Sequence, residues 1–185
     1  MKITEFVEKL AVKLPKNLRG PLLDHVTALR ELVEGELDAA RKSPDKEAKL
    51  AVTRKIVATC SAVCTTVAVE PIPLADFPIL TALQVMMIAC IMHVSGRAIS
   101  RKAIGEFIGA LGMNVGAGLV LREGARAAIK LLPGFGSAIS GAIAGGATYA
   151  LGCAATAYFI EETPLPEVRR LLRIPGRPKP GPPKQ

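Results

Sequence analysis

The sequence predicts an all-α fold, a multi-helix bundle with two apolar helical hairpins, close packing along glycine stripes and membrane association. Three observations predict it: apolar residues at helical spacing near the N-terminus, glycines every three or four residues in two later segments, and few charges in the middle of the chain. Half of the 185 residues are hydrophobic and 4% are aromatic. This composition excludes disorder of the whole chain.

The first unit, residues 1–49, is predicted to form charged amphipathic helices. Their apolar stripes are Ile3, Phe6, Val7, Leu10 and Leu14, and then Leu22, Val26, Leu29, Val33 and Leu37. Ser43 is expected to cap the next helix, which should run from about Asp45 to Val69. Pro71 and Pro73 should end that helix, because proline lacks the backbone N–H that a helix needs.

Residues 50–162 are expected to form an apolar helical core module. Its second helix should cover Phe77 to Ser95, with Gly96 as C-terminal cap and Ser100 as N-cap of the helix that follows. Two small-residue stripes come next, Gly105, Gly109, Gly112 and Gly116, and then Ser137, Gly141, Gly145, Thr148, Gly152 and Thr156. Each glycine inside a helix costs about 1 kcal/mol relative to alanine. We therefore expect the two stripes to lie against each other.

The distribution of charge favours a membrane location. The segments 77–96 and 131–160 carry no Asp, Glu, Lys or Arg, and about 20 helical residues span the ~30 Å hydrocarbon layer. Arg54 and Lys55 precede the first apolar hairpin and Arg97 follows it, which favours cytoplasmic basic termini. A short basic helix is expected at 163–174, and a Pro-rich disordered tail at 175–185.

The residues suggest no catalytic, metal or cofactor site. The segment 134–137 lacks the lysine of a nucleotide phosphate-binding loop. His25 and His93 lie in dissimilar settings. Cys60 and Cys64 lie one helical turn apart and are expected to be free buried thiols, with zinc ligation as the alternative if Cys90 or another ligand comes close. Asp76 is expected to cap the helix that contains Pro78, with a partner or ion contact as the alternative. Nucleic acid is not an expected partner, because the basic residues are not interleaved with aromatic ones.

Several short motifs resemble the domain-of-unknown-function 697 family over about residues 50–162. They are Glu70-Pro71-Ile72-Pro73-Leu74-Ala75-Asp76-Phe77-Pro78, Gln84-Val85-Met86-Met87-Ile88, Pro133-Gly134-Phe135-Gly136 and Thr148-Tyr149-Ala150-Leu151-Gly152. The residues that match the family pattern are Pro71, Pro73, Asp76, Gln84, Gly96, Pro133, Gly134, Gly136, Thr148 and Gly152. The chain departs from the pattern at Ser95, where an aromatic residue often precedes the glycine, and it shows no GTPase domain.

The resemblance implies a non-enzymatic, membrane-associated helical module. In that family the module commonly follows an Era-like small GTPase domain and has no established catalysis. The implied partners are therefore membrane lipids and a separate protein such as a small GTPase. The alternative function is a soluble helical bundle that binds a lipid or another apolar ligand between its hairpins.

Overall fold

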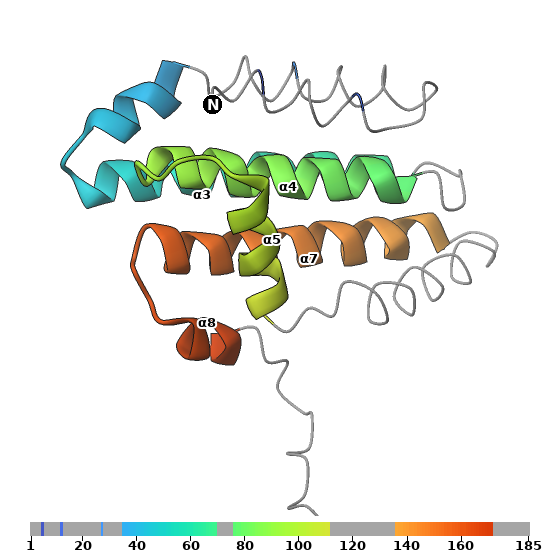
Figure 1. Cartoon of the computed structure of the whole chain (residues 1–185). Helices are drawn as coiled ribbons and strands as arrows, with labels where there is room; N and C mark the ends of the chain where they lie inside the picture. Colours follow the sequence, from blue (N-terminus) through green and yellow to red (C-terminus); the bar gives the residue numbers. More distant parts are fainter. Residues whose placement is uncertain are drawn as a thin grey trace, which may run out of the picture.

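The computed structural model describes residues 5, 12, 27, 35–69, 76–111 and 136–171, and every regular element among them is an α-helix. The predicted all-α class is therefore confirmed for this part of the chain. Helices α3 (Lys46–Val69), α4 (Asp76–Val94) and α7 (Gly136–Phe159) lie side by side, and α3 runs antiparallel to the other two (Figure 1). The shorter helices α5 (Arg101–Ala110) and α8 (Leu165–Leu171) follow α4 and α7.

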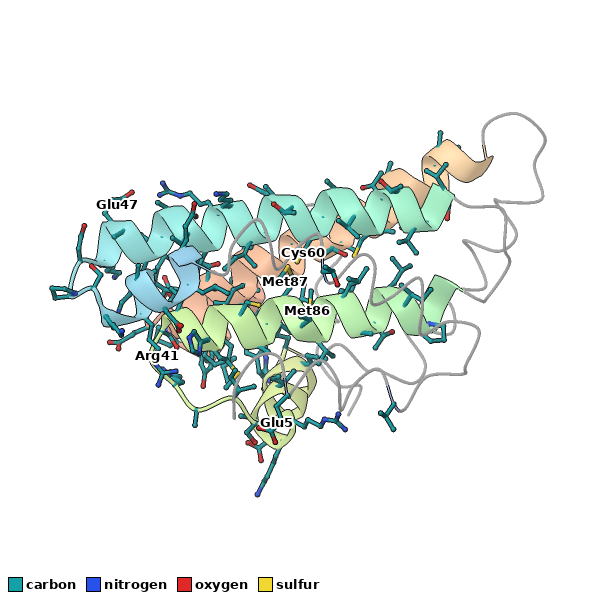
Figure 2. The ribbon with its side chains drawn as sticks, turned by 90° about the horizontal axis from the view of Figure 1, so that it is seen from above. Glu5, Arg41, Glu47, Cys60, Met86 and Met87 are labelled. Atoms are coloured by element: carbon teal, nitrogen blue, oxygen red, sulfur yellow. The ribbon has the colours of Figure 1, made fainter. Side chains whose placement is uncertain are left out.

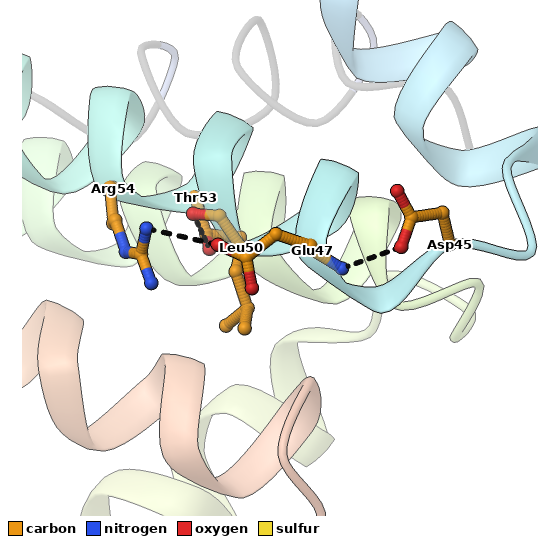
Figure 3. A network of polar contacts seen from close by, with 5 residues as sticks. All are labelled: Asp45, Glu47, Leu50, Thr53 and Arg54. Atoms are coloured by element: carbon orange, nitrogen blue, oxygen red, sulfur yellow. Dashed lines mark hydrogen bonds and ion pairs between the residues drawn. The ribbon is translucent and has the colours of Figure 1, made fainter.

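Helix α3 begins at a cap one residue before its first turn. The Asp45 carboxylate accepts a hydrogen bond from the backbone N–H of Glu47 at 3.0 Å (Figure 3). The expected cap at Ser43 is therefore wrong, because Asp45 stands directly before the helix and its side chain reaches the free N–H. Ser43 Oγ instead accepts from the backbone N–H of Asp45 at 3.1 Å and stabilises the preceding turn.

Helix α4 ends at the predicted glycine. Gly96 has a φ of +85°, a conformation that side chains other than glycine rarely adopt. Its N–H donates to the carbonyl of His93 at 2.9 Å, and the N–H of Arg97 donates to that of Met92 at 3.0 Å. This is the paired hydrogen-bond pattern of a Schellman cap, so the expectation for Gly96 is confirmed.

Helix α5 has the N-cap that the sequence predicts, and it contains the first two glycines of the predicted stripe, Gly105 and Gly109. The Ser100 hydroxyl accepts from the backbone N–H of Ala103 at 3.4 Å. The helix ends at Ala110, and Gly112 and Gly116 lie outside the described residues. The same holds for four other predicted motif residues, Pro71, Pro73, Pro133 and Gly134.

The core is centred on α4. Of its described side chains, from Pro78 to Val94, only Thr81 is exposed, and Leu83, Met87 and Ile88 are fully buried. Figure 2 shows Met86 and Met87 beside Cys60 of α3, in the region between the two helices. A helix that is apolar around its whole circumference belongs in a protein core or a membrane.

Candidate functional site

The closest helix contact in the described chain joins α3 and α7, and we call it the α3–α7 seam. On α7 it consists of Gly141, Gly145 and Gly152. A Cβ atom on Gly141 would lie 2.7 Å from Val69 Cγ2 and 3.1 Å from the backbone oxygen of Thr65. A Cβ on Gly152 would lie 2.6 Å from both γ-carbons of Val57. Only glycine fits these positions without a shift of α3.

Hydroxyl groups beside the seam are satisfied within their own helices. Ser61 Oγ donates to the carbonyl of Val57 at 2.7 Å, and Thr65 Oγ1 donates to that of Ser61 at 2.9 Å. Thr148 Oγ1 donates to the carbonyl of Ala144 at 2.9 Å. Since each hydroxyl bonds a carbonyl four residues earlier, these groups can be buried among apolar side chains without water.

Two of the predicted motif residues meet across the bundle. Gln84 of α4 donates through Nε2 to Thr148 Oγ1 of α7 at 3.0 Å. Thr148 is fully buried, whereas Gln84 is half-buried. The bond connects residues that lie 64 positions apart. Gly152, one turn after Thr148, completes the contact with α3 and comes within reach of Met87.

The glycines of α5 do not take part in the seam. Among the residues that the structure describes, nothing lies within 4 Å of a Cβ built on Gly105 or Gly109. Both glycines are exposed. The expectation that this stripe lies against the α7 stripe is therefore wrong for these two residues. The α7 glycines face α3, because α3 offers small and β-branched side chains at matching four-residue intervals.

An uncharged surface flanks the seam on the side away from α4, and we call it the α3–α7 outer face. On each helix, its exposed residues lie at or close to the seam positions, most of them one residue after such a position. They are Ala58, Ala62, Thr66 and Val69 on α3, and Ala138, Ile139, Ala142, Gly146, Tyr149 and Cys153 on α7. Three of them, Val69, Ile139 and Tyr149, are large hydrophobic side chains with exposures of 41%, 43% and 55%. Exposed apolar side chains that gather on one uncharged surface are typical of sites that contact a protein or a membrane.

Charged and polar side chains gather at the end of the bundle where α3 begins and α4 ends. His93 Nε2 lies 2.8 Å from Asp38 Oδ1, and His93 Nδ1 lies 3.0 Å from Arg41 Nη1. Since a guanidinium only donates, Nδ1 accepts and the ring proton is assigned to Nε2, which donates to Asp38. This hydrogen bond lowers the pKa of the Asp38 carboxyl below its ordinary value. Lys55 also pairs with Glu36 at 2.6 Å, so helix 35–42 is tied to both α3 and α4.

Aromatic side chains gather at this same end. The rings of Phe107 and Tyr158 are stacked with centroids 5.2 Å apart, and Phe159 lies 5.0 Å from Phe107. The guanidinium of Arg97 lies 5.3 Å from the Phe159 centroid and 5.5 Å from that of Tyr158. We call the three rings of Phe107, Tyr158 and Phe159 the aromatic cluster. No sequence pattern described above predicts it, although the adjacent Tyr158 and Phe159 at the end of an uncharged run were a usable signal.

Other predicted features are placed more simply. Cys60 and Cys64 are free and buried, which confirms the expectation for these two thiols; Cys90 is also free and buried, and Cys153 is free and exposed. Asp76 and Gly136 are the first residues of α4 and α7. The side chain of Asp76 lies outside the description, so its capping role stays a prediction. Within the described ranges, no three His, Cys, Asp or Glu side chains are grouped as a metal site would require.

Two helices are long and apolar enough to cross a membrane by length and composition, α3 over Lys46–Val69 and α7 over Ala138–Phe159. Helix α4 contributes a shorter apolar segment, Pro78–Val94. Comparison with known proteins adds no relative: no family model, no curated protein and no solved structure matches the chain. The α3–α7 seam, the α3–α7 outer face and the motif residues are therefore the features from which a function can be inferred.

Proposed function

We propose that the chain is a non-catalytic helical module inserted in a membrane through the α3–α7 outer face. The observation that carries the proposal is the uncharged, exposed surface that α3 and α7 form together. In water, this surface would leave Val69, Ile139 and Tyr149 unburied. In a bilayer the same surface would contact acyl chains, with which small and apolar side chains are compatible.

Helix lengths support this arrangement. α7 has 24 residues without a charged side chain, which at 1.5 Å per residue is about 36 Å. The hydrocarbon layer is about 30 Å thick, so α7 is long enough to cross it. The uncharged part of α3 is shorter, from Ile56 to Val69. Arg54 and Lys55 then fall at the boundary, where long basic side chains can reach the headgroups.

The internal polar groups also suit a medium without water. Ser61, Thr65 and Thr148 each bond a carbonyl of their own helix, and Gln84 bonds Thr148. Glycine contacts such as those of Gly145 allow two backbones to approach closely, and packing of this kind can hold helices together where lipid replaces water. We place the charged end of the bundle on the cytoplasmic side, following the positive-inside rule.

The partner in this proposal is a separate protein such as a small GTPase, for which the module would act as an adaptor. The motif resemblance over residues 50–162 supports this part. Its test is co-purification of the full chain with a candidate GTPase from membranes, in the nucleotide-bound and nucleotide-free forms. Equal recovery with an unrelated membrane protein would contradict the adaptor role.

Membrane insertion can be tested with two arginine substitutions on one helix. Ala51 and Ala62 are both exposed alanines of α3. Ala62 lies on the outer face, whereas Ala51 lies among the charged residues at the start of the helix. An arginine at a membrane-embedded position costs about 2.5 to 3.5 kcal/mol on insertion scales. We expect A62R to shift the protein out of carbonate-washed membranes, while A51R stays with them.

If the chain is instead a soluble bundle, A62R and A51R should behave alike. Both replace an exposed alanine, so neither should change the fold or the fraction in which the protein is found. Recovery of the wild-type chain as a monodisperse species without detergent would refute membrane insertion and favour the soluble alternative. Equal membrane retention of A62R and A51R would refute the role of the outer face. Circular dichroism of both variants in detergent controls for folding.

A further inference from the structure

Arg97 is an exposed arginine whose guanidinium is held in place by rings instead of carboxylates. It lies over Phe159 and Tyr158 at the centroid distances of 5.3 and 5.5 Å given above. Phe107 packs against both rings and is only 3% exposed. Within the described part of the chain, no carboxylate lies within the 4.0 Å ion-pair distance of Arg97. Among the described residues, the Arg97 guanidinium is therefore contacted by rings and by no carboxylate.

This arrangement suits recognition of a phosphate group. A guanidinium in cation–π contact with aromatic rings makes that contact through its charge, so its planar set of N–H donors can still bind an anion. Two of these donors can bind two phosphate oxygens side by side. Lys102, in the first turn of α5, adds positive potential near Arg97. Its Nζ lies 3.9 Å from Glu106 Oε1, and the Lys102 and Glu106 side chains are largely exposed.

The position of the aromatic cluster selects the source of the phosphate. Arg97 follows the Gly96 cap of α4, and the two rings come from the last residues of α7. If α7 crosses the hydrocarbon layer, its end lies at the membrane surface, where tyrosine is enriched and lipid phosphates are found. A guanidinium at this depth would lie at the level of the lipid headgroups.

We propose that Arg97, held by the aromatic cluster, binds the phosphate of an anionic phospholipid headgroup. The inference depends on the proposed membrane function, because the cluster reaches headgroups only when α7 is inserted. The phosphate is common to anionic and zwitterionic headgroups, but the positive charges of Arg97 and Lys102 would repel a choline cation, so the site should prefer anionic lipid. The chemistry, a phosphate oxygen pair on a planar guanidinium, is shared with free phosphate, so the test must distinguish the two.

The test measures apparent affinity from thermal unfolding of the full chain in neutral detergent. The probes are short-chain phosphatidylglycerol, short-chain phosphatidylcholine, inorganic phosphate and a hexaglutamate peptide. The variants are R97Q, R97K and the matched control R54Q, which removes another exposed arginine, one that pairs with Glu47 on α3. Folding of each variant is checked by its unfolding midpoint without probe.

We expect phosphatidylglycerol to stabilise the wild type more than the other three probes do. R97Q should weaken that apparent affinity about tenfold, the loss of one charge-assisted hydrogen-bonded pair, and R54Q should leave it unchanged. The affinity of R97K should lie between those of R97Q and the wild type, because lysine keeps the charge but lacks the planar pair of N–H donors. An R97K affinity equal to that of the wild type would show that the paired donors are not needed and would overturn this binding mode.

Other outcomes overturn the proposal as a whole. Equal stabilisation by phosphatidylcholine would show that the anionic headgroup is not recognised. Full stabilisation by inorganic phosphate would assign the site to a soluble ligand, and binding of hexaglutamate alone would assign it to a protein. An R97Q variant with wild-type affinity would exclude Arg97. These results are distinct from failure of membrane insertion, which A62R and A51R report without reference to Arg97.

Discussion

Gly145 and Gly146 are neighbours on α7 that should respond to alanine in opposite ways. A Cβ atom on Gly145 would overlap the hydroxyl of Thr65 and lie 3.2 Å from the backbone oxygen of Ser61. A Cβ on Gly146 would meet nothing within 4 Å among the described residues. The two sites share one helix and the same gain in helix propensity, so comparison of G145A with G146A isolates the contact.

The difference in unfolding free energy between G145A and G146A is set by two opposing effects. Alanine in place of glycine in a helix interior stabilises by about 1 kcal/mol, which is the whole expected effect of G146A. At Gly145 the Thr65 hydroxyl must leave its bond to the Ser61 carbonyl, and the backbone of α3 must move. Overpacking of this kind costs about 1 to 3 kcal/mol. We therefore expect G145A to be less stable than G146A by about 1 to 3 kcal/mol.

Thermal or denaturant unfolding of the full chain in neutral detergent measures the difference. T65A removes the overlapping hydroxyl and methyl groups, so the double variant G145A/T65A should recover part of the loss. The coupling energy in this double-mutant cycle isolates the pair. Equal stability of G145A and G146A would refute the close approach of α3 and α7, as would strict additivity of G145A and T65A.

Three further predictions concern the helix ends and the polar contacts. G96A should destabilise by about 1 to 2 kcal/mol in thermal unfolding, because alanine is strained at positive φ, and an unchanged midpoint would contradict the cap. T148V should cost about 1 to 3 kcal/mol by leaving the Gln84 amide without its partner, whereas Q84L/T148V should be nearly neutral; equal losses in both would argue against the bond. H93L should raise the NMR-measured pKa of Asp38 towards its ordinary value. Because the folded pKa is the lowered one, the His93 contact stabilises the fold above the ordinary carboxyl pKa, and this contribution is lost as the pH falls through the lowered value.

Local signals in the sequence were sufficient to predict the end of α4 and the start of α5. Gly96 and Ser100 act on backbone groups within a few residues, so their roles do not depend on the rest of the fold. Ser43 shows the limit of the same reasoning, because two capping residue types stood close together and Asp45 was two positions nearer the helix. The sequence pattern therefore predicted that a cap exists, and missed which side chain provides it.

The partner of a glycine stripe could not be predicted in the same way. Spacing shows that Gly141 and Gly145 share a face, but the helix opposite them is set by how the chain returns on itself. The stripe lies against Ser61 and Thr65, which have the same four-residue spacing without being glycines. The exposed Gly105 belongs to a helix that contacts α7 through rings at its end, so glycine spacing alone was an unreliable guide to contact.

The Gln84–Thr148 bond explains how α4 keeps a defined orientation in the bundle. A helix buried on almost every side has no polar face to fix its rotation, since each rotation buries similar apolar area. Gln84, together with His93 at the end of the helix, breaks this equivalence, because only one rotation pairs Gln84 with Thr148 and any other leaves the half-buried amide without this partner. Buried polar residues set helix register in coiled coils by the same cost. We infer that Gln84 contributes more to the uniqueness of the packing than to its free energy, and the near-neutral Q84L/T148V variant should therefore show a less well-defined α4–α7 contact at similar stability.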